Sequence, residues 1–311
     1  MNNLEIVQTA YKKQTIIPAF NIPYLPMMQA VVKAVADEDS FAFIQAARLE
    51  WIKFKAGSLQ AVREEYSRCG DPAHTRLHLD HVPVIDEDDE QVDFLAVISE
   101  AIGCGYQSVM VDGSRLPFDK NVDATRQAVR LAHENRIPCE AELGAVLGHE
   151  KGPLPPYDEL FSSGKGFTDI LEAADFVQKT GCDWLSVAVG NVHGAISQAS
   201  RNEKKLEARI DLAHLRRLRD AAQIPLVLHG GSGIPKDYIL QSVAAGIAKI
   251  NVGTEIRQAY EQVISRQGGI EHAREAVYNT VRALLCNHFE VSGNAGLFKS
   301  PPGAGGNYEE Q

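Results

Sequence analysis

The chain has 311 residues, 44% of them hydrophobic, and it carries a formal net charge of −10 at pH 7. This length and apolar content are enough for one large hydrophobic core or two modest ones. The acidic balance argues against a general nucleic-acid binder and against a protein that docks on an anionic membrane, so we expect neither kind of partner.

Strand-like apolar runs alternate with amphipathic helical stretches along the chain. The predicted strands are short and rich in Val, Ile and Leu, and each is followed by a stretch with helical periodicity. In chain order, the predicted strands are 15–20, 41–46, 76–80, 107–112, 137–143, 184–190, 224–230 and 247–252. The predicted helices are 24–38, 56–68, 91–104, 119–136, 168–180, 212–222, 236–245, 254–265 and 270–290.

Eight strand–helix units in succession are the number that a closed barrel requires, so we expect an α/β protein with a single (β/α)₈ TIM barrel. The barrel is expected to span residues 1–290, with 270–290 as an extra C-terminal helix. Residues 291–311 are rich in Gly and Pro, and we expect them to form a flexible C-terminal tail.

The connection after the fifth predicted strand, residues 144–166, is long and contains several Gly and Pro residues. Loops of this length inside a compact barrel are commonly functional, and a lid over the site is one interpretation. A surface insertion without function is the alternative, and the sequence leaves both open.

The five cysteines include no CxxC pair and no even set for a disulfide framework, which indicates reduced thiols. The N-terminal residues lack the apolar core of a signal peptide, and no apolar run reaches membrane-spanning length. We therefore expect a soluble, cytoplasmic protein.

Three histidines follow predicted strands that are far apart in the sequence. His81 closes HLDH, His193 lies in VGNVHG and His229 lies in VLHGGSG. All C-terminal strand ends meet on one face of a parallel barrel, and three imidazoles there make an open divalent metal site of the catalytic kind. Asp80, next to His81, adds a carboxylate, and this combination suits metal-assisted proton abstraction beside a carbonyl.

Period-2 alternation predicts which strand residues face the barrel interior. Four polar residues share this face at the ends of their strands: Asp80, Asp112, Glu142 and Asn251. A buried charge is costly unless it is paired or bound to metal, so their grouping predicts a functional site. Lys249 also faces inward, and either an imine-forming lysine or an ion pair with Glu140 is consistent with the pattern.

Two Gly-containing turns, HGGSG (229–233) and NVGTE (251–255), open predicted helices after the seventh and eighth strands. Helix N-termini offer unpaired N–H groups and partial positive charge to an anion. Because the loops after strands 7 and 8 frequently bind phosphate in such barrels, we predict a phosphate site there.

These motifs together resemble the class II, metal-dependent ketose-bisphosphate aldolases, the group that contains fructose-1,6-bisphosphate and tagatose-1,6-bisphosphate aldolases. The matching segments are AFNI (19–22), HLDH (78–81), SVMVDGS (108–114), EAELG (140–144), VAVGNVHG (187–194), PLVLHGGSGIP (225–235) and KINVGTE (249–255). The resemblance covers about residues 1–290 and implies a (β/α)₈ barrel, a catalytic Zn²⁺ ion and dihydroxyacetone phosphate as the ketone half of the substrate.

By motif position, the resemblance implies zinc ligands at His81, His193 and His229. It implies that Asp80 is the acid/base at the aldehyde-derived oxygen, and that Glu150 is a lid-loop residue that handles the C–H proton.

The resemblance also implies residues that organise the site and bind the substrate. Asp112 and Glu142 match an accessory metal or site-organising pair, and a second divalent or monovalent cation is left open. Asn251 matches a contact to the ketone's hydroxyl. The full set of expected substrate and phosphate contacts is Asn21, Gly194, Gly231, Ser232, Asn251, Gly253 and Thr254.

Several segments depart from the family pattern. After the second strand the family has a small Ser-containing loop, whereas this chain has QAARLEWIKFKAGS. Arg48 and Lys53 are expected as aldehyde-end contacts, suited to a carboxylate, a sulfonate or a second phosphate. In the lid segment, Leu147 stands where the family has a Gly, and Lys151 stands where it has an acidic residue. In the turn after the eighth strand, Gly253 stands where fructose-bisphosphate enzymes often carry Asp. The ketone half of the site therefore matches the family, while the aldehyde half is altered.

The function that the resemblance implies is a class II aldolase, an aldehyde-lyase of carbohydrate metabolism and glycolysis. It would be most like fructose-bisphosphate aldolase and would act as a homodimer or homotetramer. The alternatives left open are tagatose bisphosphate or another ketose 1-phosphate as substrate, a metal-dependent barrel hydrolase, a non-catalytic partner subunit and an imine-forming aldolase using Lys249.

Overall fold

The computed structural model describes residues 1–146, 156–192 and 208–299, and in these ranges the apolar runs form nine parallel strands. The strands are β1 (Ile17–Asn21), β2 (Ala42–Ala47), β3 (Thr75–Asp80), β4 (Val82–Pro83), β5 (Val109–Asp112), β6 (Cys139–Leu143), β7 (Trp184–Val187), β8 (Leu226–Leu228) and β9 (Ile247–Val252). Most of their residues are buried whichever way they face, as expected for a parallel sheet covered by helices.

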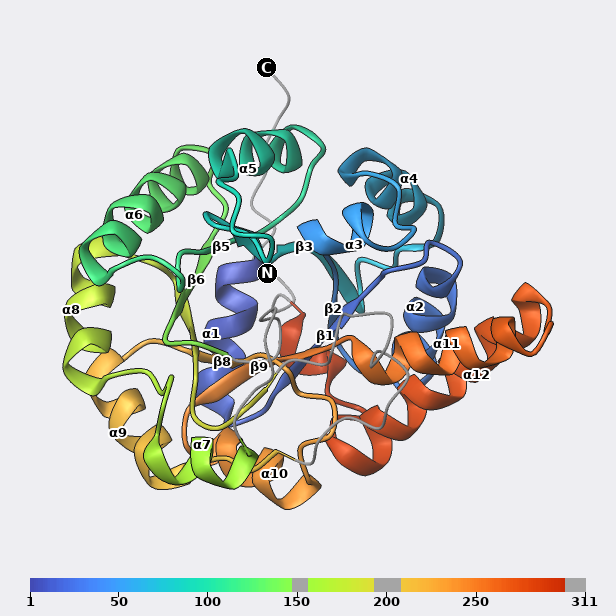
Figure 1. Ribbon diagram of the computed structural model, residues 1–311. Coiled ribbons are helices and arrows are strands. Elements are labelled where there is room, and N and C mark those ends of the chain that lie inside the picture. Colours follow the sequence, from blue (N-terminus) through green and yellow to red (C-terminus); the bar gives the residue numbers. More distant parts are fainter. Residues whose placement is uncertain (147–155, 193–207, 300–311) are drawn as a thin grey trace.

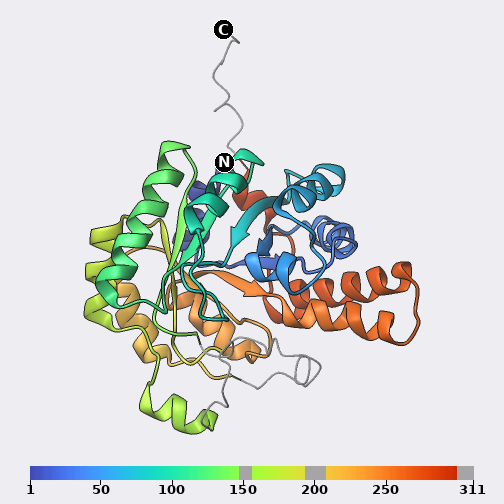
Figure 2. The ribbon, with the colours of Figure 1, turned by 45° about the horizontal axis from the view of Figure 1, so that its top comes forward.

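The helices surround the strands in an outer ring, except for α1, which lies inside that ring (Figure 1). They are α1 (Asn3–Lys13), α2 (Met27–Asp37), α3 (Arg48–Ile52), α4 (Leu59–Cys69), α5 (Phe94–Gly103), α6 (Phe118–Glu134), α7 (Tyr157–Ser163), α8 (Ile170–Thr180), α9 (Leu212–Ala222), α10 (Lys236–Ala244), α11 (Thr254–Ser265) and α12 (Ile270–Ala283). A π-helical turn at Leu284–His288 continues α12, and a 3₁₀ turn follows at Ala295–Phe298. Figure 2 shows α11 and α12 side by side, projecting from the barrel.

The sheet closes into the predicted TIM barrel. The strand order is β3-β2-β1-β9-β8-β7-β6-β5-β4, so the first and last strands of the chain are neighbours. β3 and β4 stand at the two ends of this order but are separated in the chain by His81 alone. Backbone bonds from Gln107 N to Leu77 O and from Leu79 N to Ser108 O join β3 to the residues before β5. β3 and β4 are therefore one barrel strand, interrupted at His81, in a ring of eight.

Helix α1, which the sequence analysis did not predict, covers the N-terminal end of the barrel and lies inside the ring in Figure 1. Its start is held by a reciprocal pair of bonds between Asn2 and Glu5, an arrangement that satisfies two otherwise unpaired N–H groups. Asn3 Nδ2 donates to Ser108 Oγ at 2.8 Å inside the barrel. The opposite end of the barrel, where the strands finish, is left for a site.

Three other unpredicted elements are too short for a sequence period to reveal. They are β4, α3 and α7. Helix α7 lies within the long connection after the fifth predicted strand, of which residues 147–155 are outside the described part. None of the helices described has the length and apolarity that a membrane crossing requires.

The segment after residue 290 differs from the expected flexible tail as far as residue 299. Phe298 is 3% exposed, and its ring lies 5.0 Å from that of Phe41, between centroids. Backbone bonds from Gly293 N to Glu38 O and from Ala295 N to Asp39 O hold the segment in place. Burial of one aromatic side chain offsets the ordering cost of a few residues. Residues 300–311 lie outside the described part of the chain.

We expect Phe298→Ala to lower the free energy of unfolding by about 3 kcal/mol, because the substitution leaves a cavity beside Phe41. Urea denaturation followed by circular dichroism measures this change. The matched control is Leu297→Ala, since Leu297 is 42% exposed, and its effect should stay within about 0.5 kcal/mol. Equal effects of the two substitutions would show that the segment does not contribute to the core.

Candidate active site

A cavity of about 400 Å³ opens at the C-terminal ends of the strands. Strands and loops far apart in the sequence contribute its walls, because every strand of a parallel barrel finishes on this face. Ten residues expected in the site line it: Asn21, Asp80, His81, Asp112, Glu142, His229, Ser232, Asn251, Gly253 and Thr254. Of the other expected residues, Glu150, His193 and Gly194 lie outside the described part of the chain.

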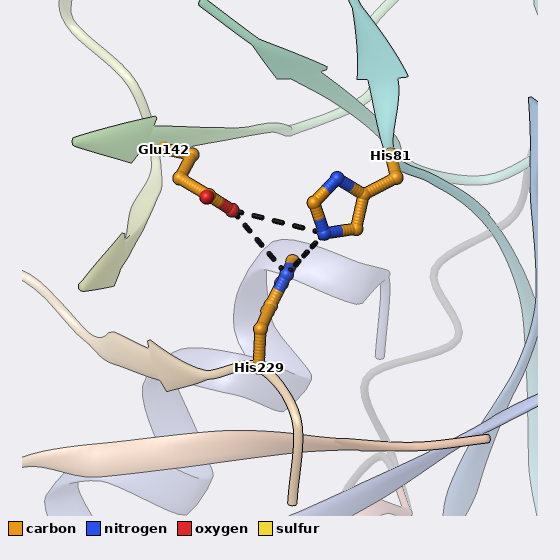
Figure 3. A group of neighbouring side chains, drawn as sticks. All are labelled: His81, Glu142 and His229. Atoms are coloured by element: carbon orange, nitrogen blue, oxygen red, sulfur yellow. Dashed lines mark hydrogen bonds and ion pairs between the residues drawn. The ribbon is translucent and has the colours of Figure 1, made fainter. Parts of the chain in front are cut away.

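Two imidazoles and a carboxylate converge in this cavity (Figure 3). His81 follows β3, Glu142 lies on β6 and His229 follows β8. His81 Nε2 and His229 Nδ1 are 2.7 Å apart, and Glu142 Oε2 lies 3.8 Å from the first and 3.4 Å from the second. The expected third histidine ligand, His193, is not described, so Glu142 is the third donor in the described residues.

The remaining nitrogen of each imidazole contacts a carboxylate. Nδ1 of His81 lies 3.3 Å from Oδ2 of Asp112, and Nε2 of His229 lies 2.7 Å from Oε1 of Glu140. When these nitrogens donate to the carboxylates, the other two nitrogens direct their lone pairs at one point. Lone pairs on two nitrogens 2.7 Å apart repel each other unless a cation, either a proton or a metal ion, lies between them. This nitrogen and oxygen donor set fits a divalent metal, and it suits Zn²⁺.

The electrostatic environment favours positive charge at the same point. Burial lowers the pKa of His81, but the bond to Asp112 and the charges of Glu142 and Asp80 outweigh it and raise that pKa to about 10. Burial lowers the pKa of His229, and the charge on His81 lowers it further. The pKa of one imidazole is thus raised and that of the other lowered, which favours positive charge on the His81 side of the pair.

The backbone at His81 explains why neighbouring residues both reach the cavity. Consecutive strand residues normally point to opposite sides, yet Asp80 and His81 both line the cavity wall. His81 has φ of +35°, outside the region that strand residues adopt. Such a conformation costs about 1–3 kcal/mol in a non-glycine residue and is found where a site requires it.

Asp80 is held by two amides. Its Oδ2 accepts from Asn21 Nδ2 at 2.8 Å and its Oδ1 from Asn251 Nδ2 at 2.9 Å, and its exposure is 2%. Burial raises the pKa of Asp80, but the charges of the two imidazoles and of Lys249 outweigh burial and lower it below its usual range. Asp80 is thus a fixed, ionised carboxylate beside the metal-ligand cluster.

Glu140 and Lys249 form a buried ion pair beneath this cluster, which answers the question that the sequence left open about Lys249. Lys249 Nζ lies 2.9 Å from Glu140 Oε2 and donates to Asn251 Oδ1 at 2.7 Å, and both charged residues are 0% exposed. Trp184 Nε1 donates to Glu140 at 2.6 Å. Bound in this way, the amine of Lys249 is not presented to the cavity as an imine-forming lysine requires.

A second group of metal-ligand type, His78, Asp80 and Glu140, lies below the first. All three are buried, and the positive charge of Lys249 stands among them through its contact with Glu140. Lys249 thus supplies at this depth the cation that two buried carboxylates require. Glu140 was absent from the expected site residues, although its inward position two residues before Glu142 was a usable signal.

The turns after β8 and β9 form the side of the cavity expected to bind phosphate. Ser232, Gly253 and Thr254 line it, and Gly253 immediately precedes α11, whose N-terminus carries the partial positive charge of the helix dipole. Gly231 was expected to contact the substrate phosphate, but its backbone N–H donates to Asn251 O at 2.8 Å. A Cβ there would lie 2.5 Å from Ile250 Cγ1, so close packing explains the glycine.

The two residues expected to contact the aldehyde end of the substrate lie outside the cavity wall. Arg48 and Lys53 do not line the cavity, and instead they pair with carboxylates of residues 86–88. Leu49, Glu50 and Phe54 line it in their place. Sequence alone does not show which side of a five-residue helix faces inward, and α3 turns its arginine outward.

Glu50 is a cavity residue that the expected site omitted. It is 7% exposed, and its Oε2 accepts from Ala47 N at 2.9 Å at the start of α3. Burial raises the pKa of Glu50 well above its usual range, and the charge of nearby Asp80 raises it further. This environment therefore disfavours a negative charge on the Glu50 carboxyl.

The chain is similar to known proteins along most of its length. The family model described as "Fructose-bisphosphate aldolase class-II" matches residues 1–296. A protein of Bacillus subtilis (strain 168) named "Probable fructose-bisphosphate aldolase" is 32% identical over 256 residues, 81% of this chain and 80% of the relative.

Two solved structures are also similar. The YdjI aldolase from Escherichia coli K12 has a TM-score of 0.73 and 27% identity, covering 94% of this chain and 98% of that one. A fructose-bisphosphate aldolase from Campylobacter jejuni, 18% identical, shares the fold with a TM-score of 0.69 over 93% of this chain and 95% of its own.

We expect Glu140→Gln to weaken zinc binding by about 10–100-fold, because the neutral amide no longer holds the His229 imidazole as a carboxylate does. Titration of the metal-free protein with zinc against a chromophoric competitor measures the change. Glu134→Gln, on the exposed face of α6, is the matched control. Urea unfolding of both variants separates loss of the site from loss of the fold, and unchanged zinc affinity in folded Glu140→Gln would contradict the role of this carboxylate.

Proposed function

The chain belongs to the family of class II fructose-bisphosphate aldolases, metal-dependent carbon–carbon lyases, and we propose that it uses zinc to cleave a phosphorylated ketose reversibly. The products in this proposal are dihydroxyacetone phosphate and an aldehyde. The observation that carries it is the convergence of two carboxylate-bound imidazoles, 2.7 Å apart, with a fixed and ionised aspartate beside them.

His81, His229 and Glu142 are the described residues that would hold the metal, and we propose His193 as a further ligand. When bound, a divalent metal supplies Lewis-acid stabilisation of negative charge on the ketone half. Asp112 and Glu140 fix the tautomers of the two imidazoles, so the ligand nitrogens are oriented before the metal arrives.

Asp80 is the proposed base for cleavage. Its ionised carboxylate accepts the proton of the hydroxyl on the carbon that becomes the aldehyde, as the bond from that carbon to the ketone half breaks. The bonding electron pair passes to the ketone half, which takes up a proton to become dihydroxyacetone phosphate. The amides of Asn21 and Asn251 hold the carboxylate in one position, which keeps the general base oriented.

The phosphate of the ketone half is proposed to bind at the turns after β8 and β9. Ser232 and Thr254 contribute hydroxyl groups there, and the N-terminus of α11 contributes N–H groups and partial positive charge. Binding of a remote phosphate helps to orient the reacting carbons. By motif position we also propose Gly194 for the phosphate and Glu150 for the C–H proton of the ketone half.

Removal of the metal is expected to abolish activity. Incubation with a chelator followed by desalting should remove measurable cleavage, and zinc should restore it, because the facing imidazole nitrogens require a cation. A coupled assay for dihydroxyacetone phosphate measures both steps. Full activity in chelator, together with inactivation by borohydride in the presence of substrate, would instead support imine chemistry.

Asp80→Asn should retain zinc but lose about two to four orders of magnitude in kcat, because the amide has no basic carboxylate to take the hydroxyl proton. Metal content by atomic absorption and turnover of the same preparation are the paired measurements. Near-normal turnover in the zinc-loaded variant would remove Asp80 from the mechanism.

A further inference from the structure

The side of the cavity away from the phosphate-binding turns takes the aldehyde half of the substrate if the proposed function holds. In the ring of eight strands, β4 and β5 lie across the barrel from β8 and β9. This side is formed by α3, by the residues that follow β4 and by Ser114 and Arg115 after β5. Its chemistry therefore decides which aldehydes fit.

The cations at this side are already paired with carboxylates of one short segment, Asp86–Asp89, which we call the acidic turn. Arg48 lies 3.1 Å from Asp86. Lys53 lies 3.0 Å from Glu87 and 2.9 Å from Asp88, and Arg115 lies 2.8 Å from Asp89. Four carboxylates thus face three cations, and this rim of the cavity carries no surplus positive charge in the described residues.

The acidic turn is itself held in shape. Asp86 Oδ1 accepts from the backbone N–H groups of Asp88 and Glu90, each at 3.0 Å, and Asp86 N donates to Glu90 O at 2.9 Å. Burial raises the pKa of Asp86, but these N–H groups and the charge of Arg48 outweigh it and lower that pKa below its usual range. Separating Arg48 from Asp86 would leave a largely buried carboxylate without its cation, which is unfavourable.

The arginine on the neighbouring part of the wall is also neutralised. Arg257 Nη1 lies 2.6 Å from Glu261 Oε2, and the guanidinium stands over the ring of Phe54 at 5.4 Å from its centroid. A phosphate monoester carries a charge of about −1.5 to −2 at pH 7. At this rim it would meet carboxylates that already pair with Arg48, Lys53 and Arg115, and like charges at short range repel.

The wall between these ion pairs is mainly apolar. Leu49, Phe54 and Ile85 present hydrocarbon surface to the cavity, and Glu50 is the buried carboxyl that stands among them. Such a surface fits carbon–hydrogen edges and hydroxyl groups of a sugar fragment, and it offers an anion no compensating charge.

We propose that the aldehyde released by this enzyme is uncharged, so that its substrate is a ketose 1-phosphate without a second phosphate, carboxylate or sulfonate. The inference rests on the proposed aldol cleavage and narrows its substrate class. It replaces the expectation that Arg48 and Lys53 bind an anionic aldehyde, because the acidic turn holds both side chains.

The test is aldol addition of dihydroxyacetone phosphate to matched pairs of aldehydes by the zinc-loaded enzyme. The pairs are glycolaldehyde with glycolaldehyde phosphate, and each glyceraldehyde enantiomer with its 3-phosphate. We expect kcat/KM to be at least about tenfold higher for the neutral member, the size of effect that one unfavourable charge contact produces. Equal or higher values for the phosphorylated members would overturn the inference.

Exchange of the dihydroxyacetone phosphate C–H proton with deuterium from solvent separates this outcome from failure of the proposed function. The exchange reports the ketone half alone. If it occurs and the phosphorylated aldehydes react better, only the uncharged-aldehyde inference fails. If neither exchange nor addition occurs in the zinc-loaded enzyme, the proposed aldolase function fails with it.

A variant with fewer negative charges tests whether the ion pairs of the acidic turn cause the preference for neutral aldehydes. The triple change Glu87→Gln, Asp88→Asn, Asp89→Asn releases Lys53 and Arg115 from their carboxylates while keeping Asp86 and its turn. The preference for the neutral aldehyde should then fall by about tenfold, because released cations attract the phosphate. The preference is the ratio of kcat/KM for the neutral aldehyde to that for the phosphorylated one. Both values come from the same variant, so a general loss of activity cancels.

The matched control removes the same charge from α6, where three acidic residues are exposed, by Asp119→Asn, Asp123→Asn and Glu134→Gln. This control should leave the ratio unchanged, since its residues lie away from the cavity wall. An unchanged ratio in the acidic-turn variant would show that its ion pairs do not exclude charged aldehydes, and would overturn the inference.

Discussion

The structure of the site depends on two imidazole nitrogens that face each other at 2.7 Å. Each imidazole contacts a carboxylate with its other nitrogen, His81 with Asp112 and His229 with Glu140. When the nitrogen that contacts the carboxylate carries the proton, the other nitrogen of the same ring carries a lone pair. The two carboxylates therefore prepare the facing nitrogens of His81 and His229 to bind a cation. Glu142 adds a third donor from β6, and its own Oε2 accepts from Ser186 on β7. Three separate strands thus combine to make one position that requires positive charge.

A series of buried contacts connects His229 in the metal-ligand cluster with Asp80, the proposed base. Glu140 contacts His229 with one oxygen and Lys249 with the other, Lys249 donates to Asn251, and Asn251 donates to Asp80. Every member is buried, and buried charges of this kind are tolerated only when each has its partner. The chain therefore ties the orientation of a metal ligand to the position of the ionised carboxylate, through a lysine whose charge supports both.

The two sides of the cavity differ in how their positive charge is used. On one side, the N-terminus of α11 carries the partial positive charge of the helix dipole, and Ser232 and Thr254 line the cavity beside it. Across the barrel, the acidic turn holds the side chains of Arg48, Lys53 and Arg115. A phosphate is consequently favoured on one side and opposed on the other. In the proposed reaction, this asymmetry directs the ketone half of the substrate to α11 and its other half to Leu49, Phe54 and Ile85.

The barrel could be predicted from the amino-acid pattern, because eight apolar runs alternating with helical periods allow few other arrangements. The same pattern correctly placed six polar residues at the strand ends: Asp80, His81, Asp112, Glu142, His229 and Asn251. It did not show α1 or the packing of Phe298, since neither lies within the strand–helix repeat. The folded barrel reveals that the positive φ of His81 lets two adjacent residues, Asp80 and His81, line the same cavity. It also decided that Gly231 serves packing, that Lys249 pairs with Glu140 and that Arg48 and Lys53 face the acidic turn. The period of residues along one strand predicts the face to which a side chain points. Its contact partner lies on another strand or loop, and only closure of the barrel brings the two side chains together.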